Sequence, residues 1–503
     1  MKIHISRTIV LIVVAVIAWG CASVQPSIYT RDQAVVDAGA VSAFAKGNLG
    51  SFSVSILDNG IPVIVKKNAT NRILALKTVL LGHAFLVLAD KVGLEAIMLT
   101  MLTKGSAKYP YADVQRLVFE KSAAISAAYG SFDMSSLDLY TIDAYFDELF
   151  DLYADCFLNP SWNAEEFPRV MNDFKLAKRQ AMNEPYSRSV ITVNEKFFAG
   201  HPYATSWDGT EASLAGITLE DVKAYYEETM LSGRIFIVAV GNFDTSVLVK
   251  KLNAAFGAMP KKPFTRPAVP PLGTGMAPDL LIETFPQSEG LAYVRADFAL
   301  PSPDNPDFPK LQVATTLLDD VLFEIVRTRH GACYSVWSGI HAFSAGYGDI
   351  TVYRTTVPGQ VKQYVDEAIS VLLSGRCIAG KVSASAEGKG GIGQEVQAKD
   401  QAGVFVPIAE ALPFYKKVFL SSFYSGQQTN ISIASQIASS IVYFDDYRHY
   451  LLMLDQVNEV SDADVVRVVK TYIRDNPMLW IALGDAEVLK SVKKESFTTF
   501  QGE

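Results

Sequence analysis

The chain has 503 residues, of which 49% are hydrophobic and four are cysteines, and its formal net charge is −8 at pH 7. This length and apolar share are enough for two or more large cores, and so few cysteines exclude a disulfide framework. The acidic balance excludes nucleic acid and anionic membrane surfaces as expected partners.

Residues 1–20 have the layout of an export signal. Lys2 and Arg7 form a basic start, and the apolar run over 9–19 is short for a membrane-spanning helix. Small residues precede Cys21 as in a relaxed bacterial lipobox, so Cys21 is predicted to carry lipid as the first mature residue. The alternative is an ordinary cleaved signal peptide followed by an incidental cysteine. Cleavage would change the net charge from −8 to −10, because two positive charges are lost.

Residues 21–50 show little pattern and are expected to be a tether, and periodic sequence begins at residue 51. Two alternating runs flank Asn59–Gly60, and Asn-Gly at that place predicts a β-hairpin. The other elements expected in this half are a strand over 73–81, a helix over 93–105, a helix over 112–122, an alternating strand over 125–140, helices over 144–157 and 165–182, and a helix–strand unit over 217–241.

Residues 258–278 are rich in proline and glycine, which predicts a linker between an N-terminal domain, 51–257, and a C-terminal domain, 279–495. The unit over 460–484 repeats the layout of 217–241, so an internal duplication is expected. Each half is predicted to be α+β, with helices packed on one face of a mainly antiparallel sheet. The other elements expected in the second half are strands over 291–300, 334–343 and 348–355, helices over 308–327 and 361–373, and a low-complexity loop over 380–394.

The helix over 93–105 reads GLEAIMLTMLTKG. It resembles the core helix of the pitrilysin/insulinase family of zinc metallopeptidases, whose pattern is roughly Gly-Leu-Ala-His-x-x-Glu-His-Met-x-x-x-Gly. Ala96 and Thr100 stand where that family has its zinc-binding histidines, and Leu99 replaces the general-base glutamate. These three residues cannot bind zinc or activate water. The resemblance therefore implies a non-peptidase homologue with the family's two-domain, half-clamshell fold, no metal ligands and no catalytic residues of its own.

The family's third zinc ligand is a glutamate on a later helix. The corresponding window over 173–180 contains none, and Glu184 lies just beyond it, where a shifted alignment would place it at the ligand position. After processing, no two histidines remain at i and i+4. Zinc is therefore expected only in a partner subunit.

Two further segments resemble family signatures. Residues 126–140 resemble the edge strand along which substrate pairs in extended form, and the alternative is a plain amphipathic strand. His201-Pro202-Tyr203 resembles a structural loop, so His201 is expected to be a loop residue.

The second half keeps one functional signature, Arg-x-x-x-Gly-x-x-Tyr, at Arg327, Gly331 and Tyr334. In the family this arginine and tyrosine reach substrate across a closed chamber, and the resemblance implies a substrate-binding role for both. The chemistry fits, because arginine is a permanent forked cation and a phenol can donate to an oxyanion. The structural alternative is a helix end followed by a turn into a strand.

The function expected from these motifs is that of a zinc-less subunit of a bacterial envelope metallopeptidase, lipid-anchored on the periplasmic side. Its expected partners are a zinc-bearing homologous subunit, a peptide substrate and the membrane reached through the N-terminal lipid. The alternative is a lipid-anchored scaffold with no role in proteolysis.

Overall fold

The structure, a computed structural model, describes residues 48, 50–87, 89–204, 206–273, 276–379 and 403–500. The predicted signal, Cys21, most of the tether and the low-complexity segment over 380–394 lie outside these ranges. Within them, no helix combines the length and the apolar character needed to span a bilayer.

The N-terminal half is built on a six-stranded sheet with the order β1-β2-β6-β3-β5-β4. The Asn59–Gly60 hairpin is confirmed, with β1 and β2 antiparallel and Gly60 at a φ of 92°. The strands are β1 (Phe52–Ile56), β2 (Pro62–Lys67), β3 (Ile73–Leu81), β4 (Ala124–Ala128), β5 (Met134–Ile142) and β6 (Ile235–Gly241). The helices of this half are α4 (His83–Leu86), α5 (Leu94–Leu102), α6 (Tyr111–Glu120), α7 (Phe146–Leu158), α8 (Phe167–Asn183), α9 (Pro185–Phe197), α10 (Glu211–Gly216), α11 (Leu219–Thr229) and α12 (Thr245–Phe256).

The C-terminal half is built on a five-stranded sheet with the order β7-β13-β8-β10-β9. Its strands are β7 (Asp279–Thr284), β8 (Ala292–Ala299), β9 (Cys333–His341), β10 (Tyr347–Thr355) and β13 (Leu479–Gly484), and β11 (Arg376–Ile378) pairs separately with β12 (Phe405–Pro407). The helices are α13 (Phe308–Leu322), α14 (Val361–Leu373), α15 (Ile408–Ser425), α16 (Asn430–Phe444), α17 (Met453–Asn458), α18 (Asp462–Val469), α19 (Ala486–Leu489) and α20 (Lys494–Thr498).

The two sheets have the same topology once β1 is set aside. In the first sheet β6 pairs parallel with β2 and antiparallel with β3, and in the second β13 pairs parallel with β7 and antiparallel with β8. The helices that lead into β6 and β13 begin with equivalent capping boxes, Thr218 with Asp221 and Ser461 with Asp464. The α+β class and the internal duplication are therefore confirmed.

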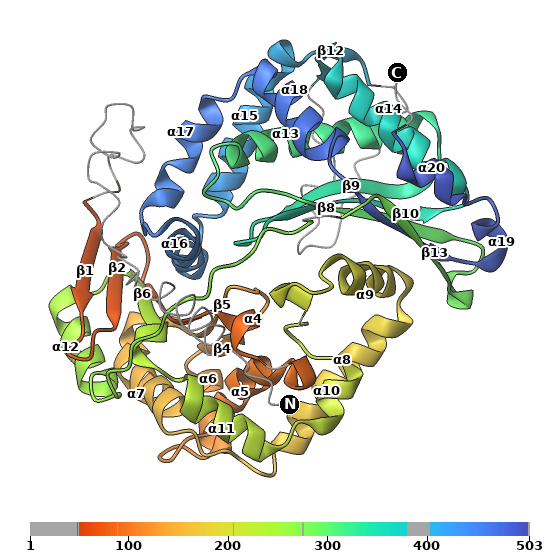
Figure 1. Cartoon of the computed structure of the whole chain (residues 1–503). Helices are drawn as coiled ribbons and strands as arrows, with labels where there is room; N and C mark the ends of the chain where they lie inside the picture. The colour runs from red at the N-terminus through yellow and green to blue at the C-terminus, as the bar shows by residue number, and fades with distance from the viewer. Residues whose placement is uncertain are drawn as a thin grey trace, which may run out of the picture.

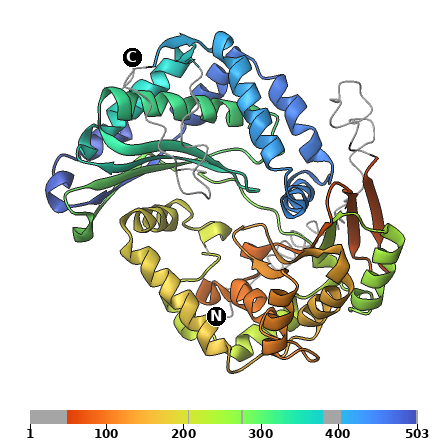
Figure 2. The same ribbon diagram turned by 180° about the vertical axis from the view of Figure 1, so that it is seen from behind.

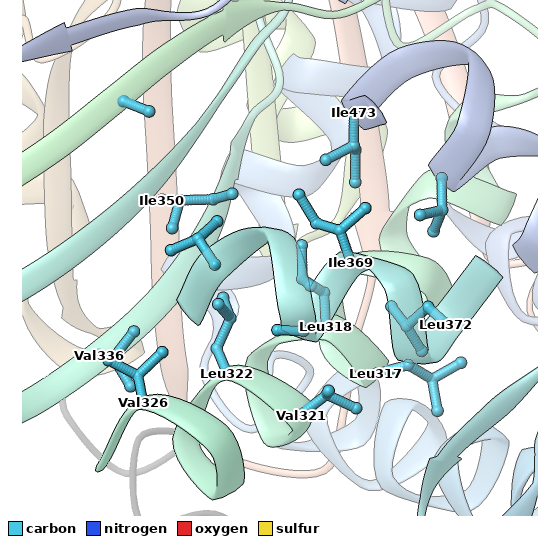
Figure 3. Packing of buried hydrophobic residues seen from close by; sticks show 14 of the residues in the cluster. Leu317, Leu318, Val321, Leu322, Val326, Val336, Ile350, Ile369, Leu372 and Ile473 are labelled. Carbon is cyan, nitrogen blue, oxygen red and sulfur yellow. The ribbon is translucent and has the colours of Figure 1, made fainter. Parts of the chain in front are cut away.

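Each sheet buries one face under helices of its own half. Figure 3 shows this packing in the C-terminal half, where α13 and α14 place leucines and Ile369 against Val336 and Ile350 of the sheet. The second face of each sheet is covered by a helix from the opposite half. Helix α16 packs on β3 and β6, and α9 packs on β8 and β13 (Figure 1). The view from behind in Figure 2 shows the same arrangement of two facing sheets with these helices between them.

Two predicted elements differ from the observed ones. The alternating run over 125–140 is a hairpin, β4 and β5, joined by residues 129–133. Alternation continues on both sides of this turn, so periodicity could not locate it. The helix predicted over 308–327 is α-helical only to Leu322 and continues as a π-helix over Phe323–Arg329.

Candidate functional site

Helix α5, whose sequence resembles the family's metal-binding helix, is almost wholly buried. It begins after Gly93, whose φ is 92° and where a Cβ would lie 2.8 Å from Gly209 Cα. Ala96 and Leu99 are fully buried in the N-terminal core, and the Thr100 hydroxyl donates to the Ala96 carbonyl at 2.7 Å. These positions therefore serve packing and local hydrogen bonding.

Helix α8, the place expected for a third ligand, meets α5 with an apolar surface. Phe174 is buried in the same core, whereas Asp173 is exposed. The buried ammonium of Lys178 is paired with Asp208 at 2.8 Å. No carboxylate of α8 is therefore directed at α5.

Glu184 is the N-cap of helix α9. Its carboxylate accepts hydrogen bonds from the backbone amides of Tyr186, at 3.1 Å, and Ser187, at 2.6 Å. This role accounts for a glutamate at that position without a metal. Across the described residues, no group of three or more His, Cys, Asp and Glu side chains is arranged to hold a metal ion.

A buried polar cluster at the start of α5 was not anticipated from the sequence. Glu95 and Arg234 are both fully buried, and Arg234 Nη2 donates to Glu95 Oε2 at 2.5 Å. The same carboxylate accepts from the Tyr225 hydroxyl at 2.5 Å and from the Ser135 hydroxyl. A glutamate in an otherwise apolar helix was the signal that could have revealed it, because buried charges are normally paired.

Electrostatics keep Glu95 ionised. Burial by itself raises the pKa of a carboxyl group, but Arg234, His83, Ser135 and Tyr225 outweigh that effect and lower the pKa of Glu95 to about 2. The cluster joins α5 to β5, to α11 and to the 3-10 turn over Ser232–Arg234 that leads into β6, so it fixes the orientation of α5.

Arg327 and Tyr334 lie together at the end of the π-helix and the start of β9. The Arg327 guanidinium carbon is 4.8 Å from the centre of the Phe323 ring and 5.6 Å from that of the Tyr334 ring. Tyr334 is 65% exposed, and Gly331 makes the turn between the two residues at a φ of 57°. The family signature thus forms one compact surface feature.

The basic residues of this turn have different partners. Arg329 pairs with Glu324 at 3.1 Å, and His330 Nε2 lies 2.9 Å from Glu367 and its ring stacks on Tyr364. Among the described residues, Arg327 has no ion pair or hydrogen bond from its guanidinium group. Arg327 is therefore held by aromatic rings while its donors stay available.

The remaining predicted segments are placed as follows. Strand β4 is an edge strand of its sheet, so the edge position expected for the segment over 126–140 is observed for its first part. His201 Nε2 lies 2.9 Å from the Pro270 carbonyl and its Nδ1 accepts from the Tyr203 amide at 3.0 Å. His201 is therefore a loop residue, as predicted.

Comparison with known proteins supports the same relationship. The family described as "Peptidase M16 inactive domain" matches residues 216–374. A curated relative, the non-peptidase homolog YmxG of Helicobacter pylori, is 21% identical over 325 residues, which cover 62% of this chain and 74% of the relative.

Solved structures share the fold at low identity. A peptidase M16 inactive domain from Pseudomonas fluorescens is 17% identical, with a TM-score of 0.72 over 86% of this chain and 98% of that one. The periplasmic protease PqqL from Escherichia coli is 16% identical, with a TM-score of 0.67 over 89% of this chain but 46% of that one.

Proposed function

The chain is a homologue of the pitrilysin/insulinase (M16) peptidases without the zinc site, and we propose from this premise that it is the zinc-less subunit of an envelope metallopeptidase. In this role it closes a peptide chamber and supplies Arg327 and Tyr334 to substrate bound at a partner's zinc site. The proposed substrates are peptides or partly unfolded segments.

The observation that carries this proposal is the state of Arg327. An arginine with no carboxylate partner among the described residues, held between two rings beside an exposed tyrosine, is suited to bind an anionic or polarised group from another molecule. A scaffold gains nothing from keeping such donors unpaired. This chain matches about half of the length of PqqL, which supports a chamber completed by a second unit of similar size.

The test is complementation by a zinc-bearing homologue. The mature chain alone is expected to bind no stoichiometric zinc after dialysis and to cleave no peptide, because Ala96, Leu99 and Thr100 offer no ligands or base. Mixing it with the zinc-bearing subunit is expected to give peptide hydrolysis that neither chain shows alone. About one zinc per isolated chain, or a partner equally active without this chain, would contradict the proposal.

A lipid anchor at Cys21 is part of the proposal and has its own test. Changing Cys21→Ser is expected to move the protein from the membrane fraction to the soluble periplasmic fraction and to abolish uptake of labelled fatty acid, because the thiol is the acylation site. Changing the buried Cys156→Ser is the matched control and should leave labelling intact. A Cys21→Ser variant that is labelled as well as the wild type would favour an ordinary signal peptide.

A further inference from the structure

The face of the C-terminal sheet that α9 covers carries a buried charge network. Arg295 and Asp297 lie on β8, Asp349 lies on β10, and none of the three is more than 3% exposed. Arg295 Nη1 is 2.9 Å from Asp349 Oδ2, and Arg295 Nε is 2.8 Å from Asp297 Oδ1. Two buried carboxylates therefore share one guanidinium group.

The two carboxylates differ in the hydrogen bonds that they receive from the protein. Asp349 also accepts from the Thr351 hydroxyl at 2.8 Å and lies 2.9 Å from His341 Nε2. Neither oxygen of Asp297 is aligned for a hydrogen bond with any described residue. A buried carboxylate without hydrogen bonds is poorly stabilised in its charged form.

The different surroundings of Asp297 and Asp349 shift their pKa values in opposite directions. Burial raises the pKa of Asp297 to about 6, with Asp349 adding to the rise and Arg295 opposing it. For Asp349, burial also acts to raise the pKa, but Arg295 and His341 outweigh it and the pKa is lowered. Asp297 is thus the member of the pair that gains a proton first as the pH falls.

Helix α9 reaches this network through Tyr186. The Tyr186 ring is 5.7 Å from the rings of Trp337 and Tyr353, and its phenol is close enough to Arg295 for the two groups to interact. The charged and titratable groups facing Asp297 are Arg295 on its own strand, Asp349 and Tyr347 on β10, His341 on β9 and Tyr186 on α9. Strand β13 places the apolar Leu479 opposite Asp297.

We propose that this network is a pH-sensitive contact between the two halves, in which protonated Asp297 leaves Arg295 free to hold Tyr186 and ionised Asp297 loosens α9 from the sheet. The ionised carboxylate competes with Tyr186 and Asp349 for a single guanidinium group and brings an uncompensated charge under α9. The protonated acid removes that charge and supplies a hydroxyl donor.

The direction of the pH dependence follows from the raised pKa of Asp297. Its contribution to docking is complete below its unfolded value of 3.8 and is lost as the pH rises through about 6. Asp349 has the opposite sign, because its pKa is lowered, so its contribution is lost as the pH falls below 3.8. Docking of α9 is therefore tightest near pH 3.8 and weakens as the pH rises through about 6.

The test is hydrogen exchange of the full mature chain at pH 5 and pH 7.5, corrected for intrinsic exchange rates. The protection of peptides from α9 is expected to fall about tenfold at the higher pH, as linkage gives for this rise in pKa. Peptides from α16 are the internal reference and should keep their protection, because Asp138, a buried carboxylate on the sheet face beneath that helix, is matched by one cation, Lys77. Equal changes in α9 and α16, or no change in α9, would overturn the proposal.

Matched variants assign the effect to Asp297. Changing Asp297→Asn, which mimics the protonated acid, should give α9 equally high protection at both pH values. Changing the exposed Asp304→Asn should preserve the tenfold difference. If folded Asp297→Asn still shows the tenfold difference in α9 protection, Asp297 is not the cause of the pH dependence and the proposal is wrong. If the variant does not fold, the comparison of α9 with α16 in the wild-type protein tests the proposal.

Discussion

Changing Tyr334→Phe is expected to lower peptide turnover of the reconstituted pair by about 10²–10³, the usual cost of losing one oxyanion donor. The change removes only a hydroxyl from a side chain that is 65% exposed, so folding and complex formation should be unaffected. Charge on the substrate oxygen develops mainly in the transition state, so the loss should appear in kcat with little change in KM.

Changing Arg327→Ala should lower turnover by a similar factor and also raise KM. The guanidinium group is a cation before and during the reaction, so it contributes to ground-state binding as well as to the transition state. The measurement is steady-state peptide hydrolysis by pairs whose assembly has been verified by gel filtration.

Matched controls for these two variants lie on the same protein. Tyr364→Phe removes a hydroxyl from a neighbouring tyrosine that stacks on His330, and Arg116→Ala removes an exposed arginine from the N-terminal half. Both should leave turnover unchanged. Unchanged turnover in Tyr334→Phe and Arg327→Ala as well would favour the scaffold alternative.

Changing Glu95→Ala is expected to lower the free energy of unfolding by about 3–5 kcal/mol. Alanine is the residue of the family pattern at this position, but here it would leave Arg234 fully buried without its carboxylate. The hydroxyls of Tyr225 and Ser135 would lose their acceptor as well. The loss is large against the marginal stability of a folded protein, and urea unfolding followed by circular dichroism measures it.

A double change tests the cause of that loss. Glu95→Leu combined with Arg234→Met replaces the ion pair by apolar side chains of similar volume and should recover much of the stability. Changing Glu120→Gln, which breaks an exposed ion pair with Arg116, is the surface control and should change little. Equal losses in the single and double variants would show that packing, and not the unpaired charge, is responsible.

The pH dependence of Glu95 provides a second readout. Because its folded pKa is lowered to about 2, its stabilising contribution is present above 4.5 and is lost as the pH falls from 4.5 toward 2. Changing Glu95→Gln should remove this part of the acid-induced loss of stability.

The sequence by itself determined that the helix over 93–105 lacks the zinc ligands and the base of the pattern it resembles, because ligand chemistry is a property of residue type. Ala96, Leu99 and Thr100 offer no zinc ligand or base in any conformation. The sequence also determined the duplicated architecture, because capping boxes and strand periodicity are local signals that the structure repeats at Thr218 and Ser461.

Only the tertiary structure decided which buried groups are partners. Glu95 and Arg234 are 139 positions apart in the sequence, so their pairing is not a local signal. Glu184 caps a helix because α9 begins at the next residue, a boundary that the sequence did not predict. The sequence likewise did not predict that α9 packs on the C-terminal sheet and α16 on the N-terminal sheet. An apolar helix face shows that a helix is covered but not by what, because the hydrophobic effect is non-directional and the partner is set by the packing of the whole chain.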